Sequence, residues 1–141
     1  SDVDTTTNCT GLSTVPWNTE SFDDDTMHDL VTNNSRLTTP TGATRVRVWA
    51  NIVTDAAGST LTHGSYGIRQ DGTTMVAQSN AVNNSSALAV IPIFTIDTGP
   101  IAVTGGTTYF EVIMVAAGCL HEADSMEDVQ VTSWFSMEVI Q

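Results

Sequence analysis

Residues 35–53 read SRLTTPTGATRVRVWANIV, and from Arg45 onward apolar and polar side chains alternate along this stretch. One face of the alternating run is apolar and consists of Val46, Val48, Ala50 and Ile52. Such alternation is typical of a strand that is buried on one face only. Pro40 and Gly42 precede it and predict a turn, because proline fixes one backbone angle and glycine reaches conformations that other residues resist. We expect the shorter run 36–39 to pair with this strand, and the pair would carry three of the four basic residues.

The net charge of the chain is strongly negative. Its 141 residues include sixteen acidic residues against four basic ones, which gives a formal net charge of -12. Such a surface repels phosphate backbones and anionic lipid headgroups, so we expect no nucleic-acid partner. The chain has no apolar run of about 18 residues, which predicts no membrane insertion. No signal peptide is seen at the start, so we expect that one was removed or that the protein leaves its cell by another route, such as lysis.

The chain is short enough to form one domain. Residues 1–14 are polar and small and predict an extended N-terminal arm, and residues 15–141 would form the folded domain. Within the domain, Asp71-Gly72 predicts a hairpin turn, and Gly99-Pro100 predicts a break between strands. Short strands separated by Gly, Asn, Asp and Pro predict an all-β sandwich.

The most apolar run covers residues 107–117. Its side chains are apolar on both faces, so we expect the opposite sheet to cover one face and take another subunit as the candidate cover for the other. The stretch 118–129 is acidic and predicts a loop. The last strand, residues 131–140, alternates again, with one face made up of Val131, Phe135, Met137 and Val139 and the other of Thr132, Trp134, Glu138 and Ile140.

The two cysteines, Cys9 and Cys119, leave two interpretations open. They pair if the N-terminal segment packs beside the strand that ends near Gly118. Otherwise they are two unpaired thiols, one in the polar arm and one in the acidic loop. The sequence alone does not decide between these states.

Several short motifs follow one another in a recognisable order. They are VPWNTESFD at 15–23, SRLTTP at 35–40 with Gly42, the alternating strand to Ile52, VTGG at 103–106 and WFSMEVI at 134–140. In this order they resemble the C1q/tumour-necrosis-factor-like jelly roll, in the form found in bacterial and bacteriophage proteins. The resemblance covers residues 15–141.

This resemblance implies a jelly-roll β-sandwich of two antiparallel sheets that assembles into a compact homotrimer. The long apolar strand and the terminal strand would supply the shared core of the trimer. The residues expected at this trimer interface are Tyr109, Glu111, Ile113, Val115, Trp134 and Ile140.

Two acidic segments are candidate cation sites. Asp23, Asp24 and Asp25 with Asp29 offer several oxygens for Ca²⁺, but they lack the alternating spacing of a dedicated loop, so a solvated turn is the simpler interpretation. The second segment contains Cys119, His121, Glu122 and Asp124. Its spacing differs from that of the zinc-binding His-Glu-x-x-His helix, and one histidine is too few for a stable zinc site. We therefore predict no metal site and no cofactor.

Three tryptophans, Trp17, Trp49 and Trp134, offer either a platform for sugar rings or buried aromatic surface. Each lies in a strand pattern, which favours the core or a subunit interface. No Ser-His-Asp order, phosphate-binding glycine loop or paired carboxylates are seen, so we expect no catalytic residues and no enzyme activity. Recognition is expected in the loops at 55–64, 79–86 and 118–129.

These inferences favour a bacteriophage virion protein that is structural and not an enzyme. It would be a trimeric capsid decoration protein, or part of a head or tail fibre, that lies on the particle surface and stabilises the particle or mediates attachment. Its expected partners are two further copies and the major capsid protein or another virion protein. The alternative is a secreted or cell-surface bacterial adhesion module of the C1q-like type, which would bind a host-surface glycan or a protein.

Overall fold

The computed structural model describes residues 5–17, 23, 25–53, 64–79, 93–123 and 133–141. Within these residues the chain forms strands and no helix, so the all-β prediction is confirmed. In chain order the strands are β1 (Thr5–Thr14), β2 (His28–Asp29), β3 (Asn33–Thr38), β4 (Arg45–Val53), β5 (Gly64–Gln70), β6 (Thr74–Gln78), β7 (Ile93–Ala102), β8 (Tyr109–Ala123) and β9 (Trp134–Val139).

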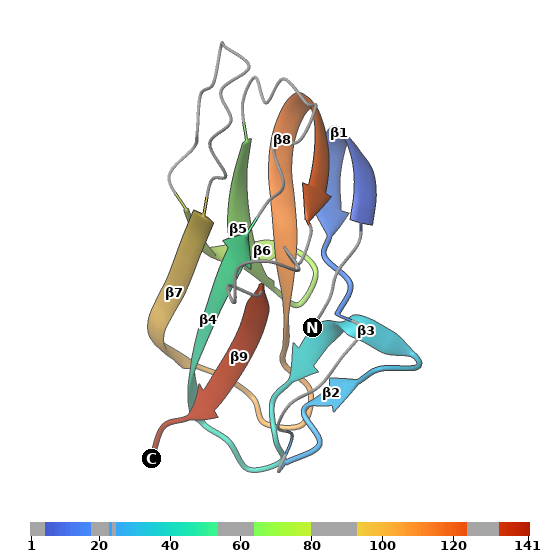
Figure 1. Ribbon diagram of the computed structural model, residues 1–141. Helices are drawn as coiled ribbons and strands as arrows, with labels where there is room; N and C mark the ends of the chain where they lie inside the picture. The colour runs from blue at the N-terminus through green and yellow to red at the C-terminus, as the bar shows by residue number, and fades with distance from the viewer. Residues whose placement is uncertain (1–4, 18–22, 24, 54–63, 80–92, 124–132) are drawn as a thin grey trace.

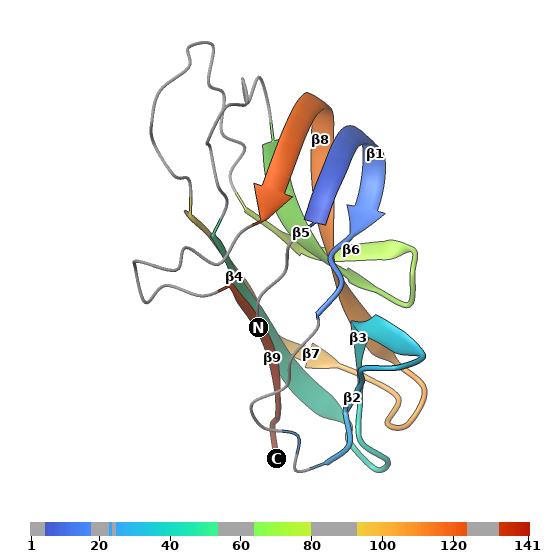
Figure 2. The same ribbon diagram turned by 45° about the vertical axis from the view of Figure 1, so that its right-hand side comes forward.

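The strands form two antiparallel sheets packed as a β-sandwich (Figure 1). The larger sheet has the order β2-β3-β8-β5-β6, and β1 pairs with β8 as its sixth strand. The smaller sheet has the order β7-β4-β9, so β4 is its central strand. Figure 2 shows β4, β7 and β9 as one layer and the larger sheet as the other. This architecture is compatible with the expected jelly roll.

The core lies between the two sheets, and β4 supplies its centre. The apolar face predicted for this strand, from Val46 to Ile52, is confirmed, because all four of its side chains are fully buried. The larger sheet faces them with Tyr66 and Ile68 from β5 and with Phe110, Val112 and Met114 from β8. Burying one large apolar side chain stabilises the folded state by about 1.5–3 kcal/mol. This layer is therefore the main source of stability.

The turn at 40–43 connects the two sheets, and this corrects one prediction. The run 36–39 was expected to pair with the strand that begins at Arg45, but β3 pairs with β8 and β4 lies in the other sheet. The turn itself is confirmed: the amide of Ala43 donates to the carbonyl of Pro40 across 3.1 Å, and Gly42 has a φ of 87°. The residues of a turn specify only that the chain reverses direction. The same turn can therefore join two strands of one hairpin or two strands in different sheets.

A second turn packs against this crossing. A Cβ atom on Gly105 would lie 2.6 Å from the carbonyl oxygen of Pro40 and 2.6 Å from the amide nitrogen of Ala43, so only glycine allows the two turns to touch. The buried hydroxyl of Thr39 lies 2.9 Å from the carbonyl oxygen of Thr108. Two of the motifs that carry the resemblance, 35–42 and 103–106, therefore meet in space.

β1 departs from the expected polar arm. Thr5–Thr14 pairs antiparallel with β8 from Ile113 to Ala123. Strand pairing is made by backbone groups, so a polar segment can join a sheet without an apolar face of its own. For the same reason β8 continues to Ala123, where the stretch from Gly118 was expected to be a loop. The rest of that predicted loop, 124–129, lies outside the described residues.

The Asp71-Gly72 hairpin between β5 and β6 is confirmed, and both residues have positive φ, at 49° and 71°. β7 differs from expectation because it continues through Gly99-Pro100. The register between β7 and β4 shifts there, and the amide of Val48 donates to the hydroxyl of Thr98 across 3.0 Å. β7 is an edge strand of its sheet, which is where a strand tolerates proline.

Candidate functional site

β8 directs alternate residues to the core and to the outer face of the larger sheet. Four of the residues predicted at the trimer interface lie on that outer face: Tyr109, Glu111, Ile113 and Val115. Glu111 and Ile113 are already buried within the single chain, with 3% and 0% of their surface exposed. Tyr109 and Val115 are half-buried. Glu111 and Ile113 therefore have almost no surface left for a partner.

The other two predicted interface residues come from the end of the chain. Phe135, Met137 and Val139 pack against the core, so Trp134 lies on the outer face of the smaller sheet. Ile140 follows β9, and its backbone amide donates a hydrogen bond to the carbonyl oxygen of Arg45 at 3.0 Å. Five of the six predicted residues therefore lie on the outer faces of two different sheets, and Ile140 lies just beyond the end of β9.

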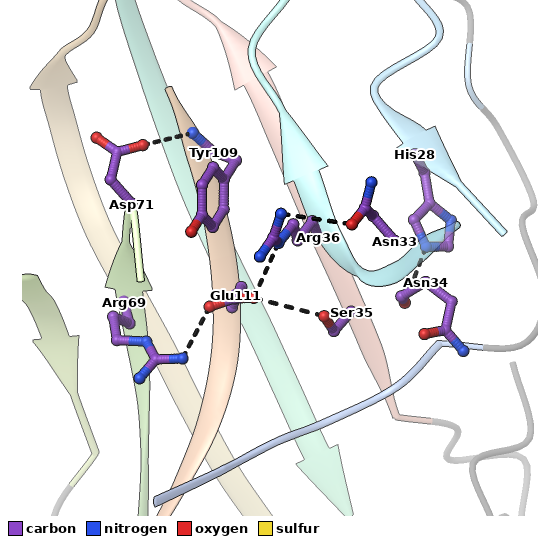
Figure 3. Close-up of polar contacts among 9 residues, drawn as sticks. All are labelled: His28, Asn33, Asn34, Ser35, Arg36, Arg69, Asp71, Tyr109 and Glu111. Atoms are coloured by element: carbon purple, nitrogen blue, oxygen red, sulfur yellow. Dashed lines mark hydrogen bonds and ion pairs between the residues drawn. The ribbon is translucent and has the colours of Figure 1, made fainter. Parts of the chain in front are cut away.

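Glu111 is the centre of a polar cluster on the larger sheet (Figure 3). Its Oε1 atom accepts a hydrogen bond from Nε of Arg36 at 3.1 Å, and its Oε2 atom accepts one from a terminal nitrogen of Arg69 at 2.9 Å. Arg36 comes from β3 and Arg69 from β5, on the two sides of β8. The cluster therefore ties three neighbouring strands together.

Neighbouring groups hold the arginine side chains in place. The guanidinium carbon of Arg36 lies 4.1 Å from the centre of the Tyr109 ring, and one of its nitrogens donates to Oδ1 of Asn33 at 3.4 Å. The backbone amide of Tyr109 donates to Oδ1 of Asp71 at 3.0 Å, which joins the β5–β6 hairpin to β8. The result is one network across the outer face of the larger sheet (Figure 3).

The geometry of this cluster indicates a structural role, because it links β3, β8 and β5. Both carboxylate oxygens of Glu111 are engaged by guanidinium groups from the two neighbouring strands, so the carboxylate joins these strands together. This cluster was not predicted from the sequence, although a signal was present. Glu111 is the one charged residue in the apolar run 107–117, and a charge in a buried strand requires charged or hydrogen-bonding partners.

The outer face of the smaller sheet gathers exposed aromatic and polar side chains. We call it the tryptophan face, and it consists of Arg47, Trp49, Asn51, Ile93, Thr95, Asp97, Trp134, Ser136 and Glu138. Trp49 is half-buried and Trp134 is 39% exposed. Asn51 pairs with Trp134 and Ser136 pairs with Trp49 across β4 and β9, so the two indoles are diagonal neighbours on one face.

An ion pair fixes one side of the tryptophan face. Nε of Arg47 donates to Oδ1 of Asp97 at 3.0 Å, and the amide of Gly99 donates to the same oxygen at 2.8 Å. These hydrogen bonds, the one from Arg47 foremost, lower the pKa of Asp97 to about 2. The guanidinium of Arg47 also lies 5.6 Å from the centre of the Trp49 ring. Asp97 is therefore ionised and oriented at any ordinary pH.

The tryptophan face has the chemistry of a contact surface. Indole rings present flat apolar area, while amide, hydroxyl and carboxylate groups beside them bond polar partners. Trp17 does not belong to it: that side chain is 3% exposed and stacks on Phe135 with ring centres 5.6 Å apart. A platform of three tryptophans is therefore excluded, and a pair remains.

The acidic turn uses its carboxylates to shape the backbone. The two carboxylate oxygens of Asp23 accept the amides of Met27 and His28 at 2.6 and 3.0 Å. Oδ1 of Asp29 accepts the amides of Thr32 and Val31, and these hydrogen bonds lower the pKa of Asp29. Within the described residues no group of three or more His, Cys, Asp or Glu side chains is placed to hold a metal ion.

Other predicted positions lie outside the described residues. They are Asp24, Asp124 and the loop segments 55–63, 80–86 and 124–129. Cys119, His121 and Glu122 belong by backbone to the end of β8, where it pairs with β1. In the part of the chain that the structure describes, no helix is long and apolar enough to cross a membrane.

Two comparisons, one with family models and one with curated proteins, return no match for this chain. Its function is therefore inferred from its own residues and surfaces.

Proposed function

We propose that the protein is a non-enzymatic virion structural protein that forms a homotrimer and decorates a capsid, or belongs to a head or tail fibre. On the particle surface it would stabilise the particle or mediate attachment. The observation that carries this proposal is the tryptophan face, where Ile93 is 55% exposed and Trp134 is 39% exposed. Large apolar side chains gathered on one face of a small sandwich are typical of a surface that another protein covers.

A trimer can use both outer faces of the sandwich. In a ring with threefold symmetry each copy contributes two different surfaces, because the contact is heterologous. The tryptophan face of one copy would then pack against a second surface of the next copy. Tyr109 and Val115 on the larger sheet keep some exposed surface and are candidates for that second surface.

The proposal is tested first by locating the protein. A producing culture is fractionated on a density gradient, and the chain is detected with an antibody. We expect it to sediment with DNA-containing particles, where labelling in the electron microscope then separates capsid from tail. A chain that stays soluble or bound to cells would contradict the virion role.

A second candidate function is adhesion to glycans at a cell surface. The observation that favours it is the pair Trp49 and Trp134 beside Asn51 and Asp97, since indoles stack on sugar rings while amide and carboxylate groups bond hydroxyls. Binding of the purified chain to a glycan array, lost in Trp134→Ala and retained in Val31→Ala, would support adhesion. Val31 is a suitable control because it is 95% exposed on the distant β2–β3 turn.

A further inference from the structure

The register of β1 against β8 brings the two cysteine positions together. Residues Thr5 to Asn8 pair with Ala123 to Leu120 in one unbroken register. Continued by one position, that register would place Cys9 opposite Cys119. The register then shifts, so that Thr10 pairs with Ala117 and one extra residue lies on β8 at this point. Cys9 on β1 and the two residues Gly118 and Cys119 on β8 therefore lie within a bulge of the strand pair.

Residues directly opposite each other in an antiparallel pair share a face of the sheet, and their Cα atoms lie roughly 4.5–5.5 Å apart. That separation is within the range of about 4.4–6.8 Å that a disulfide bond spans. We propose that Cys9 and Cys119 form an intrachain disulfide bond that fastens β1 to β8. Their separation of 110 positions in the sequence is no obstacle, because the pairing of β1 with β8 brings the two backbone positions together.

The neighbourhood of the two positions gives this bond a physical role. β5 pairs with β8 only as far as Ala116. From Ala117 to Ala123, β1 is the strand that pairs with β8 in the described part of the chain. Figure 2 shows the end of β8 and the start of β1 bending over together at the upper end of the larger sheet. A two-stranded ribbon is only marginally stable in water, so a covalent link at its inner end would hold it in register.

The composition of the ribbon strengthens this argument. Its β1 side reads Thr5-Thr6-Thr7-Asn8, which offers little apolar surface to bury. The β1 side of the ribbon can therefore contribute little hydrophobic stabilisation to the pair. A disulfide stabilises such a pair without needing a core, because it restricts the unfolded chain.

The bond forms by thiol–disulfide exchange with a low-molecular-weight disulfide such as oxidised glutathione. The thiolate of one cysteine attacks the oxidant, forms a mixed disulfide and releases one glutathione thiolate. The thiolate of the second cysteine then displaces the other, so that one S–S bond replaces another. The cysteine pair loses two electrons and two protons in total, and the oxidant gains them as two thiols. We expect this reaction after the protein leaves a reducing cytosol.

The arginine positions allow a direct test. The chain contains Arg36, Arg45, Arg47 and Arg69 and no lysine, so trypsin yields the fragments 1–36 and 70–141, each with one cysteine. The full chain is refolded with oxidised and reduced glutathione, its free thiols are blocked with iodoacetamide under denaturing conditions, and it is digested without reduction. We expect mass spectrometry to find the two fragments linked, and reduction to separate them.

Two results would overturn the proposal. One is recovery of both fragments separate and blocked at their cysteines, which would show two free thiols. The other is a pair of identical fragments linked to each other, or a dimer on a non-reducing gel, which would show a bond between chains. A further measurement compares wild-type protein with Cys9→Ser/Cys119→Ser. Reductant should lower the urea midpoint of the wild type and leave that of the variant unchanged, and an equal response in both would also contradict the bond.

Discussion

Glu111 carries a negative charge where almost all solvent is excluded, and two arginines compensate for the lost hydration. Desolvation of a carboxylate costs several kcal/mol unless hydrogen bonds and opposite charges replace the water. Arg36 and Arg69 supply both from the two sides of β8. The arginines depend on Glu111 in turn, since without it two positive groups would face each other across one strand.

We predict that Glu111→Gln lowers the free energy of unfolding by about 1–3 kcal/mol, because the amide keeps the shape of the side chain but removes the charge that both guanidinium groups face. Urea denaturation followed by tryptophan fluorescence measures the change. Glu138→Gln is the matched control, because Glu138 is exposed on the tryptophan face, and it should stay within about 0.5 kcal/mol of the wild type. Equal effects of the two substitutions would show that the cluster does not stabilise the fold.

Asp97 gives a pH dependence whose sign follows from its lowered pKa. The native carboxyl titrates at about 2, below its ordinary value of 3.8, chiefly because Arg47 hydrogen-bonds the charged form. A lowered pKa stabilises the folded state above the ordinary value, and this contribution is lost as the pH falls from about 4 to about 2. The pair is exposed to solvent, so the effect on stability is small and the titration itself is the better measurement.

We predict that an NMR titration of the Asp97 carboxyl gives a midpoint near 2 in the wild type and a higher midpoint in Arg47→Gln. The amide of Gly99 still donates to Asp97 in that variant, so the midpoint should remain below 3.8. A wild-type midpoint at the ordinary value, or one that Arg47→Gln does not move, would rule out this ion pair in solution.

At the scale of single strands, the sequence predicted the elements whose side chains decide their position. β4 alternates strictly because one of its faces is core, and Asp71-Gly72 fits its hairpin because both residues adopt positive φ. β1 could not be predicted in this way. Its residues are polar, and it joins the sheet through backbone hydrogen bonds to β8, which leave no mark on the side-chain pattern.

The pairing of strands was harder to predict than their existence. The turn at Pro40 and Gly42 was recognised, but its residues fix only the local bend. Where the chain crosses to the second sheet, this turn packs against Gly105, which is distant in sequence. The same holds for the candidate site, because Trp49 and Trp134 were identified as aromatic candidates while their position as neighbours depends on the β4–β9 register.

We predict that Gly105→Ala lowers the free energy of unfolding by about 1–3 kcal/mol, because the added Cβ would overlap backbone atoms that have no room to move. Gly42→Ala is the control, since nothing lies within 4 Å of its Cβ position and only its φ of +87° opposes the change. That strain should cost about 1 kcal/mol. Chemical denaturation of both variants measures the difference, and a Gly105→Ala protein as stable as the wild type would show that the two turns do not touch.

At the scale of the whole molecule, the net charge opposes self-assembly, whereas the exposed apolar surface favours it. Three of the arginines form ion pairs with acidic side chains, so the excess charge of the chain is carried by its remaining acidic residues. Copies with a net charge of -12 repel one another at long range. Salt screens this repulsion within about 10 Å at 0.1 M, so assembly through the tryptophan face should strengthen as salt is added.

We predict that Ile93→Glu and Trp134→Glu each convert a trimer to a monomer, because each places a charge on the exposed apolar part of the tryptophan face. Light scattering at micromolar concentration measures the mass, and circular dichroism checks that the sandwich is retained. Val31→Glu is the matched control, since Val31 is 95% exposed away from this face and should leave the trimer intact. A charge at Met114 would not serve, because that side chain is 4% exposed in the core and its replacement would unfold the chain.

The melting temperature adds an independent measurement of the same assembly. A trimer that dissociates on unfolding melts at a higher temperature as protein concentration rises, whereas a monomer does not. The wild type and Val31→Glu should therefore show concentration-dependent melting, and the Ile93 and Trp134 variants should not. A wild-type protein that is monomeric, with a melting temperature independent of concentration, would exclude self-assembly through this face and leave Trp49 and Trp134 to a partner of another kind.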